Sequence, residues 1–180
     1  GLKYFADSGT LIGAIRHEGY IPWDDDIDLV MLREDYDKFV QIAPKWLKED
    51  LVLQTVYTEK NYLRGHAQIR NSKTCGCNEE DKKAGYNCGI FIDIFPLDGM
   101  PKTEKERKNW AKKIQFYWTV LYTWYRFDYY ENATVFGKLL HGIGMLLHVP
   151  MVKAYKGYEK LCTRFKGKDT EYVCDTVFIR

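Results

Sequence analysis

The stretch Asp24-Asp25-Asp26-Ile27-Asp28-Leu29-Val30-Met31 joins a dense acidic run to an apolar strand, and the interpretation of the chain starts from it. Side chains of an extended strand alternate between two faces, so Asp26 and Asp28 share one face while Ile27 and Leu29 point to the other. A solvated acidic turn is the ordinary fate of a charge run. Here the run leads into an apolar strand, and two carboxylates held this close raise each other's pKa unless a cation compensates. We therefore expect a divalent metal.

The type of metal follows from the spacing of the acidic residues. An EF-hand calcium loop would use Asp24, Asp26 and Asp28 as its first three ligands. Leu29, however, stands where that loop needs glycine, and Asp35 replaces its final glutamate. Mg²⁺ binds through a few carboxylates together with water and substrate phosphates. The sequence therefore predicts a Mg²⁺ or Mn²⁺ site on Asp26 and Asp28, with Asp24 as a further candidate ligand, suited to phosphoryl-type transfer.

A further aspartate lies inside the apolar segment 89–95, which we predict to be a strand closed by Pro96. An aspartate in such surroundings costs free energy unless it is paired, hydrogen-bonded or coordinated. Asp93 is therefore a candidate third metal ligand, or the base that deprotonates an attacking hydroxyl. The structural alternative is an aspartate that caps nearby backbone. Asp98, after the proline, is interpreted as a turn residue.

Ser8-Gly9-Thr10 begins a predicted helix shortly before the acidic run. Backbone N–H groups and the helix dipole at such an end bind phosphate, and a glycine allows close approach. We therefore predict that Ser8, Gly9 and Thr10 contact the phosphates of a nucleotide donor. Arg16 and His17 lie further along the same helix and are candidates for the same role, with a solvated Arg16 as the alternative.

The periodicity of apolar residues predicts an α/β (α+β) fold, a mixed sheet flanked by helices with a helical C-terminal half. Residues 1–100 form the catalytic core, and residues 101–180 form a helical extension of the same domain. Thr103 and Glu106 are predicted to form a capping box at the start of a long helix. The remaining elements are strands at 4–6, 27–31, 51–57 and 66–70, helices at 11–17, 36–47 (broken or kinked at Pro44), 135–147 and 152–165, and a loop at 73–87.

Composition limits the partners and the compartment. A length of 180 residues fits one domain, and a net charge of +2 favours no nucleic-acid partner. Five widely spread cysteines are typical of free thiols in a reducing compartment. A zinc site would need Cys75, Cys77 and Cys88 plus a distant ligand, and we favour free thiols because the spacing is unusual for zinc. No secretory signal is visible, and both chain ends look truncated, as in a fragment of a longer protein.

The segment 135–147 is predicted to be a helix with one apolar face. Lys138, His141 and Pro150 argue against a membrane-spanning helix. A helix packed into the core is the default interpretation. The alternative is a helix on a membrane surface, giving peripheral membrane contact through Val135–Leu147.

Four stretches together resemble the LicD family, which includes the fukutin-related proteins: residues 4–17, 19–28, 33–39 and 89–99. That family resembles the nucleotidyltransferase superfamily, whose pattern is a Gly-Ser or Gly-Thr helix start, an acidic pair on a strand, and a later aspartate on a neighbouring strand. The matching positions here are Gly9, Thr10, Asp26, Asp28 and Asp93. The resemblance implies a nucleotidyltransferase-like fold.

The resemblance also implies transfer of a phospho-alcohol, typically phosphocholine from CDP-choline, to a sugar hydroxyl of a cell-surface glycan, with release of CMP. The glycan would be teichoic acid, lipopolysaccharide or a similar polymer, lipid-linked in some cases. This implies a cytoplasmic protein working at the inner face of a bacterial membrane. The family continues with Tyr-Gly and Pro-Pro elements that this chain lacks. Two alternatives stay open: an Asp-x-Asp glycosyltransferase that uses a nucleotide sugar, and an inactive metal-binding scaffold.

Overall fold

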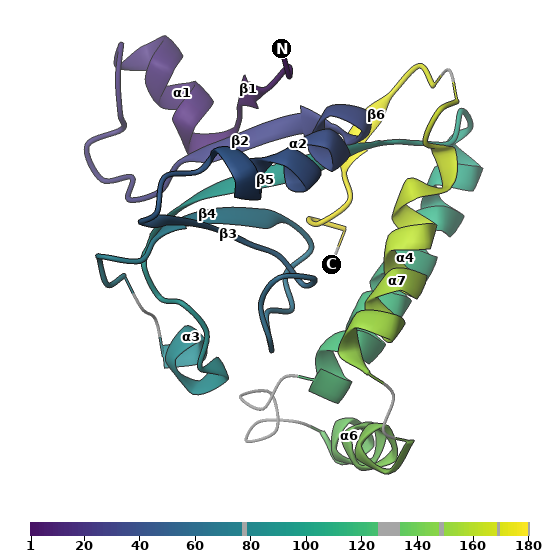
Figure 1. Ribbon diagram of the computed structural model, residues 1–180. Coiled ribbons are helices and arrows are strands. Elements are labelled where there is room, and N and C mark those ends of the chain that lie inside the picture. Colours follow the sequence, from purple (N-terminus) through teal and green to yellow (C-terminus); the bar gives the residue numbers. More distant parts are fainter. Residues whose placement is uncertain (77–78, 126–133, 148–149, 169, 180) are drawn as a thin grey trace.

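The computed structural model describes residues 1–76, 79–125, 134–147, 150–168 and 170–179. Within them lies a mixed sheet with the strand order β1-β2-β5-β4-β3, and β6 also pairs with β5 (Figure 1). β2 and β5 are parallel, and the other pairings are antiparallel. The strands are β1 Phe5–Ala6, β2 Asp28–Leu32, β3 Leu51–Gln54, β4 Ala67–Asn71, β5 Ile90–Gly99 and β6 Val173–Asp175. The predicted α/β class with a mixed sheet is confirmed.

The two faces of the sheet differ in chemistry because side chains alternate along each strand. Leu29, Ile94 and Ala67 are in register across β2, β5 and β4. They belong to the apolar face, which α2 (Arg33–Trp46) covers through a cluster that includes Tyr36 and Ala43. The residues one position away in each strand therefore lie on the opposite face, and that face carries the polar side chains.

β5 is longer than predicted, because the strand passes through Pro96 instead of ending there. Pro96 lies between Ile94, which pairs with β4, and Leu97, which pairs with β6. The backbone N–H of Asp93 donates to the carbonyl of Ile27 on the β2 side. Backbone N–H groups alternate in direction along a strand, so the nitrogen of Pro96, three residues later, points away from β2. On that side no hydrogen bond of the sheet needs a donor at residue 96. Asp98 consequently lies inside a strand, and its interpretation as a turn residue was wrong.

The second half of the chain packs mainly on itself. α4 (Glu104–Tyr125) and α7 (Met151–Cys162) lie side by side, and α6 (Val135–Leu147) packs against α4 near the C-terminal end of α4 (Figure 1). The core shared by α4 and α7 includes Trp110, Ile114, Trp118, Leu121, Tyr155 and Tyr158. The predicted capping box is confirmed, since Thr103 Oγ1 lies 3.3 Å from the N–H of Glu106 and the Glu106 carboxylate 3.4 Å from the N–H of Thr103.

Several predicted boundaries were wrong, and each has a local cause. α1 (Ser8–Arg16) begins at Ser8 and not at residue 11. α2 continues past Pro44 to Trp46, because a proline near the last turn removes a single hydrogen bond. The predicted loop 73–87 contains the helix α3 (Glu79–Ala84).

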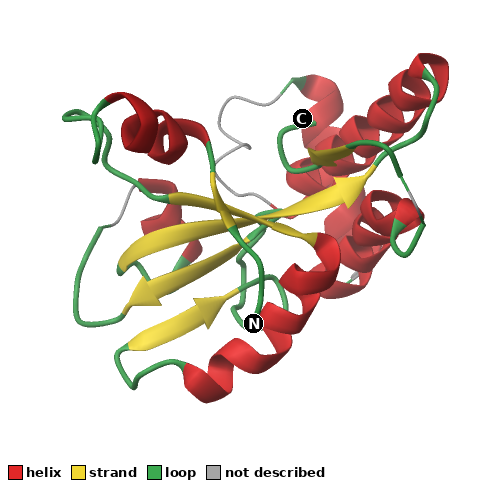
Figure 2. Cartoon of the chain, turned by 90° about the horizontal axis from the view of Figure 1, so that it is seen from above, coloured by secondary structure: helices red, strands yellow, loops and turns green. Residues whose placement is uncertain are grey.

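The C-terminal part also departs from the prediction of a purely helical half. α7 ends at Cys162 and gives way to the 3₁₀ turn η1 (Thr163–Phe165). The chain then returns to the sheet as β6. This strand has only three residues, which is too short to show a strand periodicity in the sequence. Seen from above, helices flank the twisted sheet (Figure 2). None of the helices within the described ranges is long and apolar enough to cross a membrane.

Candidate functional site

Strand pairing places the predicted carboxylates together. Asp28, the first residue of β2, is in register with Asp93 of β5, so both side chains lie on the polar face of the sheet. Asp26 lies just before β2, and one oxygen from each of Asp26, Asp28 and Asp93 lies within 4.8 Å of the other two. Asp24, Asp25 and Asp26 form a second group by the same measure. Carboxylate oxygens at this spacing are the ligands that Mg²⁺ or Mn²⁺ would use.

The electrostatics of this cluster are those of uncompensated negative charge. Burial is the main cause that raises the pKa of Asp28 to about 6, and the charges of Asp26, Asp93, Asp7 and Asp24 add to it. The pKa of Asp26 is raised for the same reasons, with burial first and the neighbouring carboxylates next. A divalent cation among these groups would favour their ionised forms and reverse the shift.

Asp24 provides an independent test of whether a cation fits here. Its Oδ2 atom is buried and has no hydrogen-bond partner among the described residues. The carboxylate packs so closely on Gly9 that a Cβ at that position would lie 2.1 Å from Asp24 Oδ2. A buried carboxylate oxygen without a donor is costly, and a cation would satisfy it. The residues therefore fit a metal ion, and Gly9 is glycine because Asp24 needs the space.

The helix start of α1 lies against the acidic cluster, as the prediction requires. The hydroxyl of Thr10 accepts a hydrogen bond of 2.9 Å from the backbone N–H of Asp28, so it connects α1 to the first residue of β2. Ser8 Oγ donates to Asp7 Oδ2 at 3.2 Å. Ser8, Gly9 and Thr10 are thus brought to the site, although the hydroxyl of Thr10 is already used in holding Asp28.

Arg16 and His17 are not brought to the cluster in the same way. They lie at the other end of α1, about 10 Å along the axis from Gly9, and both are exposed. The ring of His17 packs edge-on against Trp23, with centroids 6.3 Å apart. Within the described ranges, no hydrogen bond or ion pair joins either residue to the carboxylates, and their role as donor contacts stays a prediction.

Two buried residues of the site were missed in the sequence. Asp93 Oδ1 accepts a hydrogen bond of 2.7 Å from Gln68 Nε2 and lies 2.9 Å from His66 Nε2. Gln68 Oε1 in turn accepts from Arg70 at 3.1 and 2.8 Å, and Arg70 pairs with Asp81 at 3.1 Å. This polar chain holds Asp93 by one oxygen and leaves Oδ2 to other partners.

A signal for these residues was present in the sequence. His66-Ala67-Gln68-Ile69-Arg70 alternates polar and apolar residues, as a strand with one polar face would. The register Gln68–Asp93 then places the Gln68 amide beside the aspartate. The alternation shows which side chains share a face, but the partner strand cannot be read from the segment alone.

The cysteines do not form the zinc set that was considered. Cys75, Cys162 and Cys174 are free thiols, whereas Cys88 is disulfide-bonded and Cys77 lies outside the described residues. The expectation of free thiols is therefore wrong for Cys88, and a zinc site on Cys75, Cys77 and Cys88 is disfavoured. Burial raises the pKa of the Cys162 thiol to about 12, so this residue is a packing group and not a nucleophile.

Comparison with known proteins identifies several relatives of this chain. Lipopolysaccharide cholinephosphotransferase LicD of Haemophilus influenzae is 38% identical over 105 residues, which cover 58% of this chain and 38% of that protein. Ribitol 5-phosphate transferase FKRP of mouse is 43% identical over 42 residues, which cover 23% of this chain and 8% of FKRP. The human FKRP gives the same figures.

The chain thus spans well under half the length of these curated relatives. A family model described as LicD/FKTN/FKRP, nucleotidyltransferase domain, matches residues 1–124, which include every strand of the sheet except β6 and all the carboxylates of the cluster. The chain belongs to the LicD/FKTN/FKRP nucleotidyltransferase-domain family.

Proposed function

We propose that this chain is the catalytic part of a metal-dependent transferase that moves a phospho-alcohol from a CDP-alcohol donor to a sugar hydroxyl of a cell-surface glycan, releasing CMP. The observation that carries the proposal is the grouping of Asp26, Asp28 and Asp93 beside the N-terminus of α1. Phosphocholine from CDP-choline is the group we favour, because a lipopolysaccharide cholinephosphotransferase matches this chain over 105 residues. The ribitol 5-phosphate transferases support a phospho-alcohol as the broader class.

Asp26, Asp28 and Asp93 would hold Mg²⁺ or Mn²⁺, with Asp24 as a further ligand. Such an ion, when bound, neutralises charge on the donor diphosphate and stabilises the leaving CMP. Asp93 reaches this position because Gln68 and His66 hold its Oδ1 atom, so that Oδ2 is available as a ligand. Thr10 keeps α1 and β2 at a fixed separation, which places the N–H groups of Gly9 and its neighbours where a phosphate would approach the carboxylates.

In the reaction, the acceptor hydroxyl forms a new O–P bond with the phosphorus that carries the alcohol. The P–O bond to CMP breaks, and its electron pair leaves with CMP. The acceptor proton passes to a base in the site. Catalysis of this kind consists mainly of positioning and charge stabilisation, which a rigid strand pair with buried polar support provides.

Two other functions can be separated from this one by the same assay. A glycosyltransferase would use its Asp-x-Asp pair on a nucleotide sugar, and an inactive scaffold would bind metal without turnover. CMP release would be measured for the full-length protein with CDP-choline, CDP-ribitol, CDP-glycerol and UDP-sugars, with and without Mg²⁺ or Mn²⁺. We expect metal-dependent release of CMP from a CDP-alcohol and no release of UDP from the UDP-sugars.

Variants sharpen this assay. Asp26→Asn and Asp28→Asn should each abolish CMP release while circular dichroism stays unchanged. Asp50→Asn removes the same charge from an exposed position and is the matched control. Turnover that survives Asp26→Asn would contradict the proposal, and release of UDP from a nucleotide sugar would favour the glycosyltransferase.

We further propose that α6 contacts the cytoplasmic face of a membrane, where a lipid-linked glycan acceptor is found. Four apolar side chains of α6 are exposed, which the default interpretation of a core helix did not expect: Val135 is 86% exposed, Phe136 69%, Leu139 60% and Leu146 79%. Full-length protein should sediment with anionic liposomes, and Phe136→Glu with Leu139→Glu should reduce the bound fraction. Equal sedimentation of this double variant and the wild type would refute the contact.

A further inference from the structure

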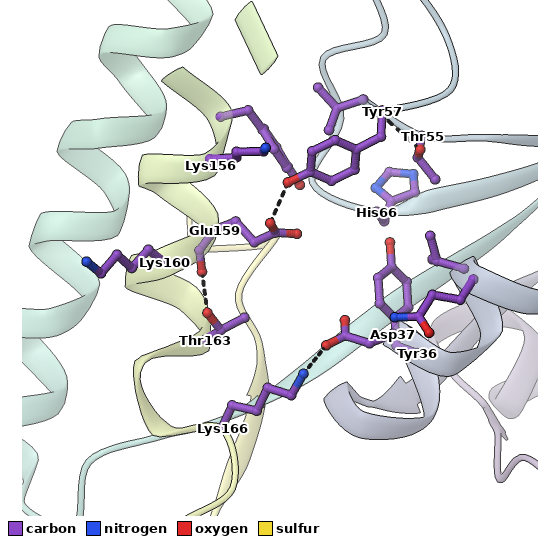
Figure 3. Close-up of a pocket in the computed structure, with 14 residues that line it drawn as sticks. Tyr36, Asp37, Thr55, Tyr57, His66, Lys156, Glu159, Lys160, Thr163 and Lys166 are labelled. Atoms are coloured by element: carbon purple, nitrogen blue, oxygen red, sulfur yellow. Dashed lines mark hydrogen bonds and ion pairs between the residues drawn. The ribbon is translucent and has the colours of Figure 1, made fainter. Parts of the chain in front are cut away.

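A cavity of about 420 Å³ lies beyond His66, between α2, the segment that follows β3, and α7 (Figure 3). Its walls come from both halves of the chain. Tyr36 belongs to α2, Tyr57 follows β3, and Tyr155 and Glu159 belong to α7. A volume of this size lies in the range of small-ligand sites and is several times larger than a single water molecule needs.

The chemistry of the walls is a mixture of aromatic rings and hydrogen-bonding groups. The Tyr57 hydroxyl donates to Glu159 Oε2, and Lys166 pairs with Asp37 across the mouth (Figure 3). Both contacts join the sheet half to the helical half of the chain. Sugar hydroxyls each need a donor and an acceptor, and such carboxylate, hydroxyl and ammonium groups supply both. The ring of Tyr57 offers an apolar surface to the carbon face of a sugar.

Two other ligand classes fit these walls less well. A quaternary ammonium group is bound by aromatic rings and carboxylates in the absence of competing cations. Here three lysines, Lys156, Lys160 and Lys166, line the cavity beside two carboxylates. A phosphate would meet the carboxylate of Glu159, which Figure 3 shows directed into the space. A neutral polyhydroxylated ligand is repelled neither by the lysines nor by the carboxylates, so it is the class that fits these walls.

The position of the cavity relative to the acidic cluster gives it a role. His66 lines the cavity, and its Nε2 atom lies 2.9 Å from Asp93 Oδ1. One imidazole ring therefore separates the cavity from a carboxylate of the cluster. A sugar bound in the cavity would therefore lie next to the acidic cluster.

We propose that this cavity is an acceptor subsite, which binds a neutral sugar unit next to the one that receives the phospho-alcohol. The inference rests on the proposed function for the identity of the acceptor, but its chemistry is set by the cavity walls. Tyr57 and Glu159 carry the specificity, because they face the space from opposite halves of the chain. Their side chains are partly exposed, so replacing them leaves the buried core intact.

The test measures saccharide binding by the full-length protein in the absence of donor. Methyl glycosides of glucose, galactose and N-acetylglucosamine are the probes, with choline chloride and inorganic phosphate as contrasting ligands, and saturation-transfer NMR is the readout. We expect at least one glycoside to bind the wild type, and Tyr57→Phe with Glu159→Gln to weaken it about tenfold or more. Lys153→Ala, an exposed change on the same helix, is the control.

Mn²⁺ affinity and CMP release from CDP-choline, measured on the same variants, separate this inference from the proposed function. We expect Tyr57→Phe with Glu159→Gln to keep the Mn²⁺ affinity of the wild type and to raise the KM for the glycan. Failure of every glycoside to bind would overturn the subsite, whether or not CMP is released. Binding of choline or phosphate with the same dependence on Tyr57 and Glu159 would overturn it as well. If the wild-type protein binds a glycoside but releases no CMP, this result would count against the proposed function alone.

Discussion

The carboxyl group of Asp28 makes the metal-free site sensitive to pH. Its pKa is raised from 3.8 to about 6 in the folded chain, first by burial and then by the neighbouring carboxylates. A raised pKa means that the ionised group destabilises the fold, fully so above about pH 6. The effect shrinks as the pH falls below 6 and is lost near the ordinary value of 3.8.

Asp28→Asn should therefore raise the melting temperature of the metal-free protein at pH 8, and raise it less at pH 5, because the charge is removed. Differential scanning fluorimetry with EDTA at both pH values measures this. Asp50→Asn, an exposed carboxylate in a surface pair, should shift the melting temperature little at either pH. An equal gain from Asp28→Asn at pH 8 and pH 5 would contradict the assigned cause.

Gln68 connects Asp93 to Arg70, and this contact gives a second prediction. Gln68→Met keeps the volume but removes the donor to Asp93 Oδ1 and the acceptor for Arg70. Loss of such an outer contact weakens metal binding by about 10- to 100-fold. Isothermal titration with Mn²⁺ should show this loss.

Gln54→Met is the matched control for this experiment. Gln54 is equally buried, is paired in register with Gln68, and donates to the backbone of Asn87 and not to Asp93. This variant should lose stability without losing Mn²⁺ affinity. A similar loss of affinity in both variants would indicate a general effect of polar burial in place of a specific contact.

Among the elements, β5 depends on a buried ion pair beyond Pro96. Arg33 Nε and Nη2 each donate to Asp98 at 2.7 Å, and Thr176 Oγ1 donates to the same carboxylate at 2.8 Å. Asp98 is 1% exposed and Arg33 6%. This pair joins the start of α2, the end of β5 and the segment after β6.

Asp98→Ala leaves the Arg33 guanidinium buried without its partner, so we expect a loss of about 3–5 kcal/mol in the free energy of unfolding. Urea denaturation measures this loss. Asp50→Ala removes a carboxylate from the surface pair with Lys73 and should cost about 1 kcal/mol or less. A small effect at Asp98 would mean that the carboxylate is not needed for the packing of β5.

The local elements were predictable where periodicity and neighbouring residues determine them. The capping box at Thr103 and the helix 135–147 were confirmed, since their signals lie within a few residues of each other. β5 beyond Pro96 and β6 were missed, because whether a strand tolerates proline depends on which edge is paired. That pairing involves residues far apart in the sequence.

The same distinction applies to the site. Asp93 could be predicted because an isolated charge in an apolar strand has few physical explanations, and Asp26 and Asp28 because their acidic run leads directly into an apolar strand. Their proximity follows from the parallel register of β2 and β5. His66 and Gln68 required that register to be known. The close approach of Asp24 to Gly9 was also beyond prediction, because the loop that carries Asp24 has no periodicity.

At the scale of the whole molecule, the segment after β6 packs against one face of the sheet. Val177 is 1% exposed and packs with Val30 and Phe95 on the polar face, and a Cβ at Gly65 would lie 2.8 Å from Val177 Cγ2. This contact completes an apolar patch beside the acidic cluster. It therefore joins the end of the described chain to the centre of the fold.

Val177→Ala should lower the free energy of unfolding by about 2 kcal/mol, because the two missing methyl groups would leave a cavity enclosed on all sides. Chemical denaturation followed by tryptophan fluorescence and by circular dichroism should give one coincident transition for both halves. Val173→Ala, on the exposed side of β6, should cost about 0.5 kcal/mol or less. Separate transitions for the two probes would show that the sheet and the helical half unfold independently.

The pairing of β5 also determines the order in which the protein can be assembled on the ribosome. A nascent chain that has emerged only as far as Gly99 can pair β5 with β2 and β4, but residues 97–99 lack their pairing with β6 until β6 has been synthesised. An unpaired strand edge is a template for association with other chains. During the interval between synthesis of β5 and synthesis of β6, this edge of β5 is therefore open to association with other chains.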